Sequence, residues 1–107
     1  MDLWVRIAGI VAAGFPSAAE GYEDEPLNLH DWLVQHPAAT FLYRVRGQAL
    51  FAEGIRDGSL LIVDRSVTAV PGRLVVAEED GQFVVGRYRG GAGQVVCGVV
   101  VASVTRH

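Results

Sequence analysis

The side chains that could act as nucleophile or base restrict the chemistry open to this 107-residue chain. All nine of its basic residues are arginines, so the sequence contains no lysine. A Ser-Lys dyad needs a lysine whose pKa is brought toward neutrality by desolvation, because serine is a poor nucleophile until a base removes its proton. The sequence therefore excludes such a dyad within these residues.

Serine and histidine offer no clear substitute for that dyad. Ser59 and Ser66 each fall at or beside a predicted turn or strand end. A Ser-His-Asp triad would have to recruit His30, His36 or His107, and nothing in their spacing supports one. We expect His30 and His36 to be exposed or capping residues beside a helix.

No metal or cofactor site is predicted either. The acidic residues Glu20, Glu23, Asp24 and Glu25 cluster between residues 18 and 26, but no histidine lies among them, so a solvated loop is expected. Cys97 is the one cysteine and lies in an apolar run, where a buried thiol behaves as a small hydrophobic group.

Charge and hydropathy narrow the classes of partner. The formal net charge is -3, half of the residues are hydrophobic, and no basic patch for nucleic acid is present. Arg87 and Arg89 flank Tyr88, which is typical of the solvent face of a strand. Contact with nucleic acid is therefore not expected.

The apolar stretch over residues 3–13 raises the question of a membrane or secretion signal. Residues 11–13 (VAA) resemble a signal-peptidase site, but Asp2 precedes the single Arg6 and the run is short. It is also shorter than the roughly 20 residues that span a bilayer. We expect a packing arm, a cytoplasmic protein and no membrane contact.

One helix is predicted, over residues 28–36. Asn28 can cap its first turn, Asp31 stands at its third position, and Pro37 ends it. Its apolar face would consist of Leu29, Trp32 and Leu33.

The rest of the chain has the pattern of short strands. Residues 4–7 suit an extended arm or edge strand, and residues 18–26 a polar connector. Turn signals at 57–58, 71–72, 80–81 and 90–93 separate strand-like runs at 41–46, 60–63, 74–76, 83–85 and 95–104. This spacing predicts a mostly β protein, a twisted sheet or partly closed barrel with one short helix.

Several segments resemble the UmuD/LexA family of self-cleaving peptidases. The most specific is residues 54–64 (GIRDGSLLIVD), and the resemblance covers most of the chain from residue 13 onward. The other matching segments are residues 13–19 (AGFPSAA), 27–29 (LNL), 33–40 (LVQHPAAT), 71–77 (PGRLVVA), 80–85 (DGQFVV) and 98–100 (GVV). The resemblance implies a peptidase-type β-domain of the LexA/UmuD C-terminal kind.

Members of this family cut a peptide bond with a Ser-Lys dyad, and this chain departs from that pattern at both positions. The nucleophile position is Ala49 and the base position is Gly86. The neighbouring Arg87 cannot replace the base, because a guanidinium stays protonated. The cleavage-like bond, Ala13-Gly14, is retained. We therefore expect a degenerate member without peptidase activity.

The resemblance also implies an organisation and partners. Residues 1–26 would form an arm with the cleavage-like segment and a linker, and residues 27–107 the β-domain. The family implies a homodimer that associates with a Y-family DNA polymerase subunit and the RecA filament in the SOS response. Dimerisation through the last strand or the arm is expected, since an unpaired apolar edge invites strand addition.

Two alternatives stay open. One is an active self-cleaving serine peptidase with an unrecognised nucleophile. The other is an interaction module that has inherited the fold and acts as a decoy or antagonist.

Overall fold

The structure is a computed structural model that describes residues 3–7, 25–47, 50–91 and 93–107. The chain divides into two compact units, Met1–Gln35 and His36–His107. Each unit is considered by itself. The predicted boundary between an arm (residues 1–26) and a peptidase-like domain (residues 27–107) stays a prediction.

The first unit contains a two-stranded antiparallel sheet of β1 (Trp4–Ile7) and β2 (Glu25–Asn28). The predicted extended arm over residues 4–7 is therefore a strand. The predicted connector was wrong at its end, because Glu25 and Pro26 belong to β2. Pro26 is tolerated there because a strand in a two-stranded sheet has one unpaired edge that needs no N–H donor.

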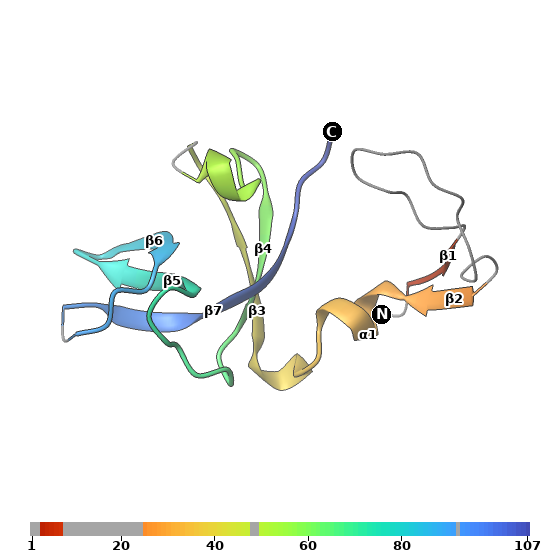
Figure 1. Cartoon of the computed structure of the whole chain (residues 1–107), viewed down its shortest axis with the longest axis horizontal. Helices are drawn as coiled ribbons and strands as arrows, with labels where there is room; N and C mark the ends of the chain where they lie inside the picture. The colour runs from red at the N-terminus through yellow and green to blue at the C-terminus, as the bar shows by residue number, and fades with distance from the viewer. Residues whose placement is uncertain (1–2, 8–24, 48–49, 92) are drawn as a thin grey trace. The chain divides into compact units, whose positions relative to one another are not determined.

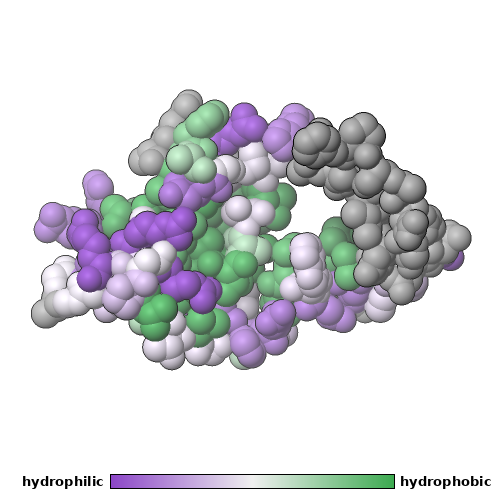
Figure 2. Space-filling model, in the orientation of Figure 1, coloured by the Kyte–Doolittle hydropathy of each residue, from purple (hydrophilic) through white to green (hydrophobic). Residues whose placement is uncertain are grey.

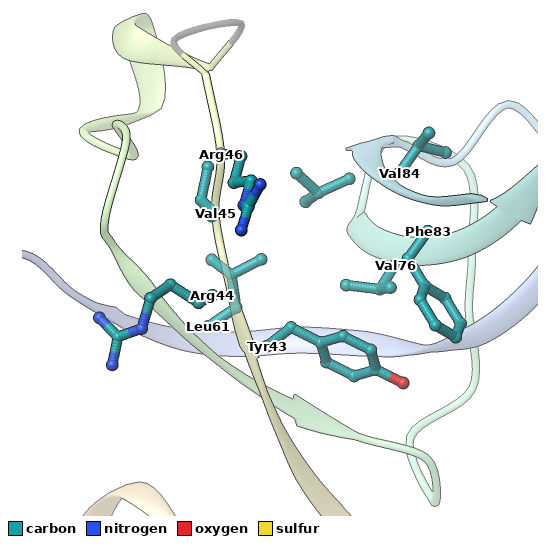
Figure 3. A pocket seen from close by; sticks show the side chains of 9 residues that line it. Tyr43, Arg44, Val45, Arg46, Leu61, Val76, Phe83 and Val84 are labelled. Carbon is teal, nitrogen blue, oxygen red and sulfur yellow. The ribbon is translucent and has the colours of Figure 1, made fainter.

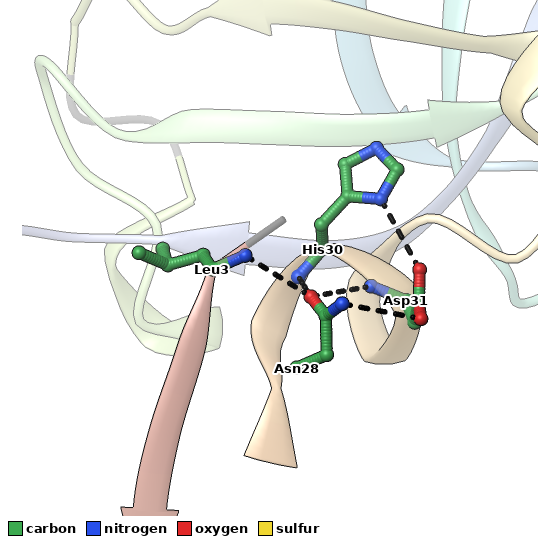
Figure 4. Close-up of polar contacts among 4 residues, drawn as sticks. All are labelled: Leu3, Asn28, His30 and Asp31. Carbon is green, nitrogen blue, oxygen red and sulfur yellow. Dashed lines mark hydrogen bonds and ion pairs between the residues drawn. The ribbon is translucent and has the colours of Figure 1, made fainter. Parts of the chain in front are cut away.

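The helix α1 (Leu29–Leu33) follows β2 directly and is capped as the sequence predicts. The Asn28 side-chain oxygen accepts from the backbone N–H groups of His30 and Asp31, and also from that of Leu3 (Figure 4). The helix is shorter than predicted, since it ends at Leu33 and not at the residue before Pro37. Val34 is its C-cap, with a φ of -116° that no helix continues. No residue of α1 is buried.

The second unit is a five-stranded antiparallel sheet with the order β3-β4-β7-β5-β6 (Figure 1). Its strands match the predicted runs. They are β3 (Thr40–Arg44), β4 (Leu60–Asp64), β5 (Leu74–Glu79), β6 (Gln82–Arg87) and β7 (Val95–Val104). Two 3-10 turns, η1 (Pro37–Ala39) and η2 (Phe51–Glu53), precede β3 and follow the loop after it.

The two halves of β7 pair with different strands. Its first half pairs with β5 and its second half with β4, with a register shift in each pairing. The last strand therefore lies inside the strand order, although each half of it is paired on one side only, and the expected dimerisation through it stays a prediction. Within the described residues the outer strands are β3 and β6, and they are not paired with each other. The mostly β prediction with one short helix is confirmed, as an open sheet and not a closed barrel.

The core of this unit consists of residues from β4, β5 and the turn before β4. Ile55, Leu61, Val63 and Val76 form the buried cluster, and Tyr43, Val85 and Cys97 are among the half-buried residues that pack against it. Cys97 is thus a packing residue, as its place in an apolar run predicts. The tight β5-β6 turn uses Asp80 and Gly81, both at positive φ (51° and 79°), which matches the Asp-Gly turn signal.

Candidate functional site

Of the residues predicted for the peptidase site, the structure describes Gly86. It lies in β6 directly opposite Val75 of β5. A Cβ atom built on Gly86 would meet no heavy atom within 4 Å, so the space beside this backbone is open. Ala49 and the Ala13-Gly14 bond lie outside the described residues, and their predicted roles stay predictions.

Arg87, next to Gly86, connects β6 to η2. Its Nη2 lies 3.6 Å from Oε1 of Glu53, and its Nη1 donates to the carbonyl of Gly72 at 2.9 Å. A guanidinium held between a carboxylate and a carbonyl remains a cation, so it cannot accept a proton from a nucleophile. The geometry therefore gives Arg87 a structural role.

Ser59 is one of the two serines that could replace a missing nucleophile. Its hydroxyl is already engaged in hydrogen bonds. It is 1% exposed, its Oγ lies 2.7 Å from Oγ1 of Thr105, and it accepts from the backbone N–H of Arg56 at 3.0 Å. These bonds tie the turn before β4 to the segment after β7. A buried hydroxyl used in this way is not available to attack a peptide bond.

Ser66, the other serine, belongs to a polar cluster around Asp64. Asp64 ends β4, is 2% exposed, and accepts from the Ser66 hydroxyl at 2.6 Å and from the Ser66 backbone N–H at 2.8 Å. Nδ1 of His36 lies 2.5 Å from the other carboxylate oxygen. The hydrogen bonds from Ser66 and then His36 lower the pKa of Asp64 to about 2.

This cluster has the residue types of a hydrolytic triad but not its connectivity. In a triad the serine hydroxyl bonds to the imidazole, whereas here Ser66 bonds to the carboxylate. The cluster instead stabilises a buried carboxylate at the end of β4 by hydrogen bonds. His36 is half exposed as expected, but its pairing with a residue 28 positions away was missed. Nothing in local spacing points to such a long-range contact.

A groove of about 90 Å³, lined mainly by apolar side chains but also by Arg44 and Arg46, lies between the outer strands β3 and β6. Leu61 and Val76 line it, and the rings of Tyr43 and Phe83 meet edge to face with their centroids 5.5 Å apart. Figure 3 shows these two rings on one side of β3, with Arg44 extending to the other. Phe83 is 60% exposed, so the groove offers a large aromatic surface to solvent.

Comparison with known proteins decides the family. The model of a family described as Peptidase S24-like matches residues 6–96. Protein MucA of Escherichia coli is 49% identical over 77 residues, which are 72% of this chain and 53% of that protein. Protein ImpA of Shigella flexneri is 43% identical, over 80% of this chain and 61% of that protein.

The chain belongs to the Peptidase S24-like family. A LexA repressor, that of Ectopseudomonas mendocina, is 36% identical over 82% of this chain and 43% of that protein. The predicted resemblance to the UmuD/LexA family is confirmed. The chain spans about half the length of the curated relatives it matches.

Within this S24-like domain, the segment that resembles the family most specifically, residues 54–64, forms β4 and the turn before it, next to the central strand β7. It begins at Gly54, whose φ of 75° ends η2, and continues through the buried Ile55 and Ser59 into β4. The motif is therefore a folding element that contributes half of the buried hydrophobic residues, namely Ile55, Leu61, Ile62 and Val63. No helix in the described part of the chain is long and apolar enough to cross a membrane.

Proposed function

We propose that this chain is a non-catalytic S24-like protein that acts through protein-protein interaction and dimerisation in the SOS response and translesion DNA synthesis. The observation that carries the proposal is chemical. Glycine stands at the position of the family's base, and no lysine exists elsewhere in these residues. A serine placed anywhere in this chain would lack the amine that activates it in the family.

The nucleophile position supports the same conclusion. Ala49 carries a methyl group, which has no lone pair with which to attack a carbonyl carbon. The serines that the structure describes at 59 and 66 are bonded to Thr105 and Asp64 and contribute to stability. The Ala13-Gly14 bond would consequently stay intact, and the protein would persist in its uncleaved form in the cytoplasm.

Without catalysis, what remains is an interaction surface. The groove between β3 and β6, with the exposed ring of Phe83, suits contact with a second copy or with a partner protein. We propose that this surface supports a homodimer. We further propose a Y-family DNA polymerase subunit and the RecA filament as partners, on the basis of the family.

A pull-down from cells with damaged DNA, using this chain as bait, tests the proposed pathway. We expect a Y-family polymerase subunit or RecA among the captured proteins, and a weaker yield of either with a Phe83→Asp bait. Leu42→Asp, at an equally exposed position on the other face of β3, is the matched control. If the bait returns neither protein while retaining its fold, the translesion assignment is contradicted.

A further inference from the structure

The second unit gathers arginines from three separate segments at one end of its sheet. Arg44 ends β3 opposite Leu60, the first residue of β4, and Leu60 is opposite Val104 of β7. The turn before β4 meets the segment after β7 at the same end, because Oγ of Ser59 lies 2.7 Å from Oγ1 of Thr105. In Figure 1, η2 and the C-terminus both lie at this end, at the top of the second unit. The exposed cations brought together are Arg44, Arg46, Arg56 and Arg106.

These four arginines are not neutralised by carboxylates. Within the described residues, none of the four guanidinium groups forms an ion pair with an aspartate or a glutamate. Arg44 donates to the carbonyl of Gly58 at 2.9 Å, and Nη2 of Arg56 lies 3.2 Å from Nδ1 of His107. Both contacts use acceptors without a negative charge, so the positive charges stay available to an anion.

The few carboxylates nearby are already engaged. Residues 44–59 and 104–107 contain two of them, Glu53 and Asp57. Glu53 pairs with Arg87 at 3.6 Å, and Asp57 accepts from the backbone N–H of Gly47 at 2.9 Å. This end of the sheet therefore has an excess of positive charge.

The negative net charge of the whole chain does not oppose this local excess. Residues 1–35 contain six of the twelve carboxylates and one of the nine arginines, so residues 36–107 are net positive. At 0.1 M salt, exposed charges act over only about 10 Å. The sequence-based expectation of no contact with nucleic acid rested on the spacing of the arginines along the chain, whereas folding brings four of them to one end.

A pocket of about 340 Å³ opens among these cations. It is lined by Phe51, Gly54, Arg56, Thr105 and His107, and none of these carries a carboxylate. The Phe51 side chain is 63% exposed, so a flat ligand can reach its ring. Nucleobases stack on exposed aromatic rings, and a guanidinium group pairs well with phosphate. The pocket thus combines the two kinds of group that hold a nucleotide.

We propose that this end of the second unit binds single-stranded nucleic acid, with a base stacked on Phe51 and neighbouring phosphates paired with Arg56 and the other three arginines. Stacking and charge attraction do not distinguish the bases, so binding should be independent of sequence. A duplex should bind more weakly, because its bases are stacked on one another. The proposal goes beyond the proposed function, which concerns protein partners, and does not depend on it.

Fluorescence anisotropy with the full chain and a labelled oligo(dT) of about 12 nucleotides tests this proposal. We expect a dissociation constant of about 1–100 µM near 0.1 M salt, which rises steeply as salt is added. Phe51→Ala should weaken binding about tenfold, whereas Phe51→Trp should bind at least as tightly as the wild type. Arg56→Gln and Arg106→Gln should each weaken binding about fivefold and make the salt dependence shallower, because one phosphate contact is lost.

The chain offers a matched control pair at the other end of β3 and β4. There the guanidinium of Arg65 lies 5.3 Å from the ring centre of Phe41, and Thr40 is opposite Asp64. Phe41 is 42% exposed, so its ring is also accessible. Phe41→Ala and Arg65→Gln remove the same groups as the test variants and should leave the affinity for the strand unchanged.

Two competitor ligands separate this proposal from simple attraction of anions. A glutamate peptide of similar length carries the charge without the bases, and an oligo(dA)-oligo(dT) duplex carries the phosphates with its bases covered. Both should bind at least tenfold more weakly than the single strand. A dissociation constant above about 1 mM for the strand near 0.1 M salt would overturn the proposal. Equal binding of either competitor, or equal effects of the Phe51 and Phe41 changes, would overturn it as well.

Discussion

Asp64 illustrates how a single buried carboxylate is stabilised in this fold. It is almost completely buried, and three hydrogen bonds from Ser66 and His36 replace the water that burial removes. Because His36 precedes η1 and Asp64 ends β4, these bonds also hold the start of the second unit to its sheet. The cluster thus stabilises the fold, although its serine, histidine and aspartate are the residue types of a hydrolytic triad.

Replacing the carboxylate should therefore destabilise the protein. We expect Asp64→Asn to lower the free energy of unfolding by about 2 kcal/mol, since charged hydrogen bonds are exchanged for weaker neutral ones. Urea denaturation measures this difference. Asp31→Asn is the control, because that side chain is exposed. Equal stability of the Asp64 variant and the wild type would contradict the role assigned to the cluster.

The same residue predicts how stability depends on acid. The pKa of Asp64 is lowered by folding from 3.8 to about 2. A carboxyl group with a depressed pKa contributes stability above its unfolded value and loses it as the pH falls through its folded value. The advantage of the wild type over Asp64→Asn should be constant above about pH 5 and should shrink as the pH falls from 3.8 to 2. A difference that does not change over this range would contradict the assignment.

At the scale of the strands, two glycines have opposite packing environments. A Cβ atom on Gly98 of β7 would lie 2.6 Å from Cγ1 of Val63, which is fully buried in β4. Gly98 therefore permits the close approach of β7 to the core. Gly86 of β6 has no such constraint, since its Cβ position is open.

These environments predict opposite outcomes for the same substitution. Gly98→Ala should reduce the free energy of unfolding by about 1–3 kcal/mol, because a packed neighbour has to move. Gly86→Ala should be neutral or slightly stabilising, since alanine restricts the unfolded chain. Thermal denaturation of the two variants, side by side, checks both. A Gly86→Ala loss as large as that of Gly98→Ala would contradict the open space beside β6.

The sequence was most informative where a local rule decides the structure. Alternating apolar residues predicted the strands, the Asp80-Gly81 pair predicted its turn, and Asn28 predicted the start of α1. The end of α1 was predicted too late. A proline marks the last position at which a helix can end, but the backbone leaves the helical conformation earlier, at Val34.

Features that depend on long-range pairing were not predictable in this way. The position of β7 inside the strand order follows from pairing with strands up to 44 residues earlier in the chain, as in the pairing of Leu60 with Val104. The His36-Asp64 contact and the Ser59-Thr105 contact are likewise products of tertiary structure. For the candidate site, the resemblance predicted that Ala49 and Gly86 stand at the dyad positions. It could not predict the contacts of the residues around them.

At the scale of the whole molecule, the surface that we propose for association comprises the outer strands β3 and β6 of the second unit and their exposed apolar side chains. Figure 2 shows hydrophobic surface between hydrophilic side chains on the face it presents. Phe83 on β6 and Leu42 on β3 are 60% and 59% exposed, which makes them suitable for matched substitutions. Phe83 lines the groove with Tyr43, whereas Leu42 does not line it.

A dimer that uses the groove should be sensitive to only one of these residues. We expect multi-angle light scattering to give a dimer mass for the wild type and for Leu42→Asp, and a monomer mass for Phe83→Asp. A charge placed in an apolar interface is costly, whereas the same charge on a solvated face is not. A monomeric wild type at high concentration, or a dimeric Phe83 variant, would contradict this mode of association.

The central claim, that this S24-like chain does not cleave itself, is tested most directly by its intact mass after incubation with activated RecA filament. With Ala49 and Gly86 at the positions that we propose for the dyad, and no lysine among the 107 residues, we predict that the mass stays unchanged at every time point. A fragment that begins at Gly14 would contradict the claim and show that another nucleophile is at work.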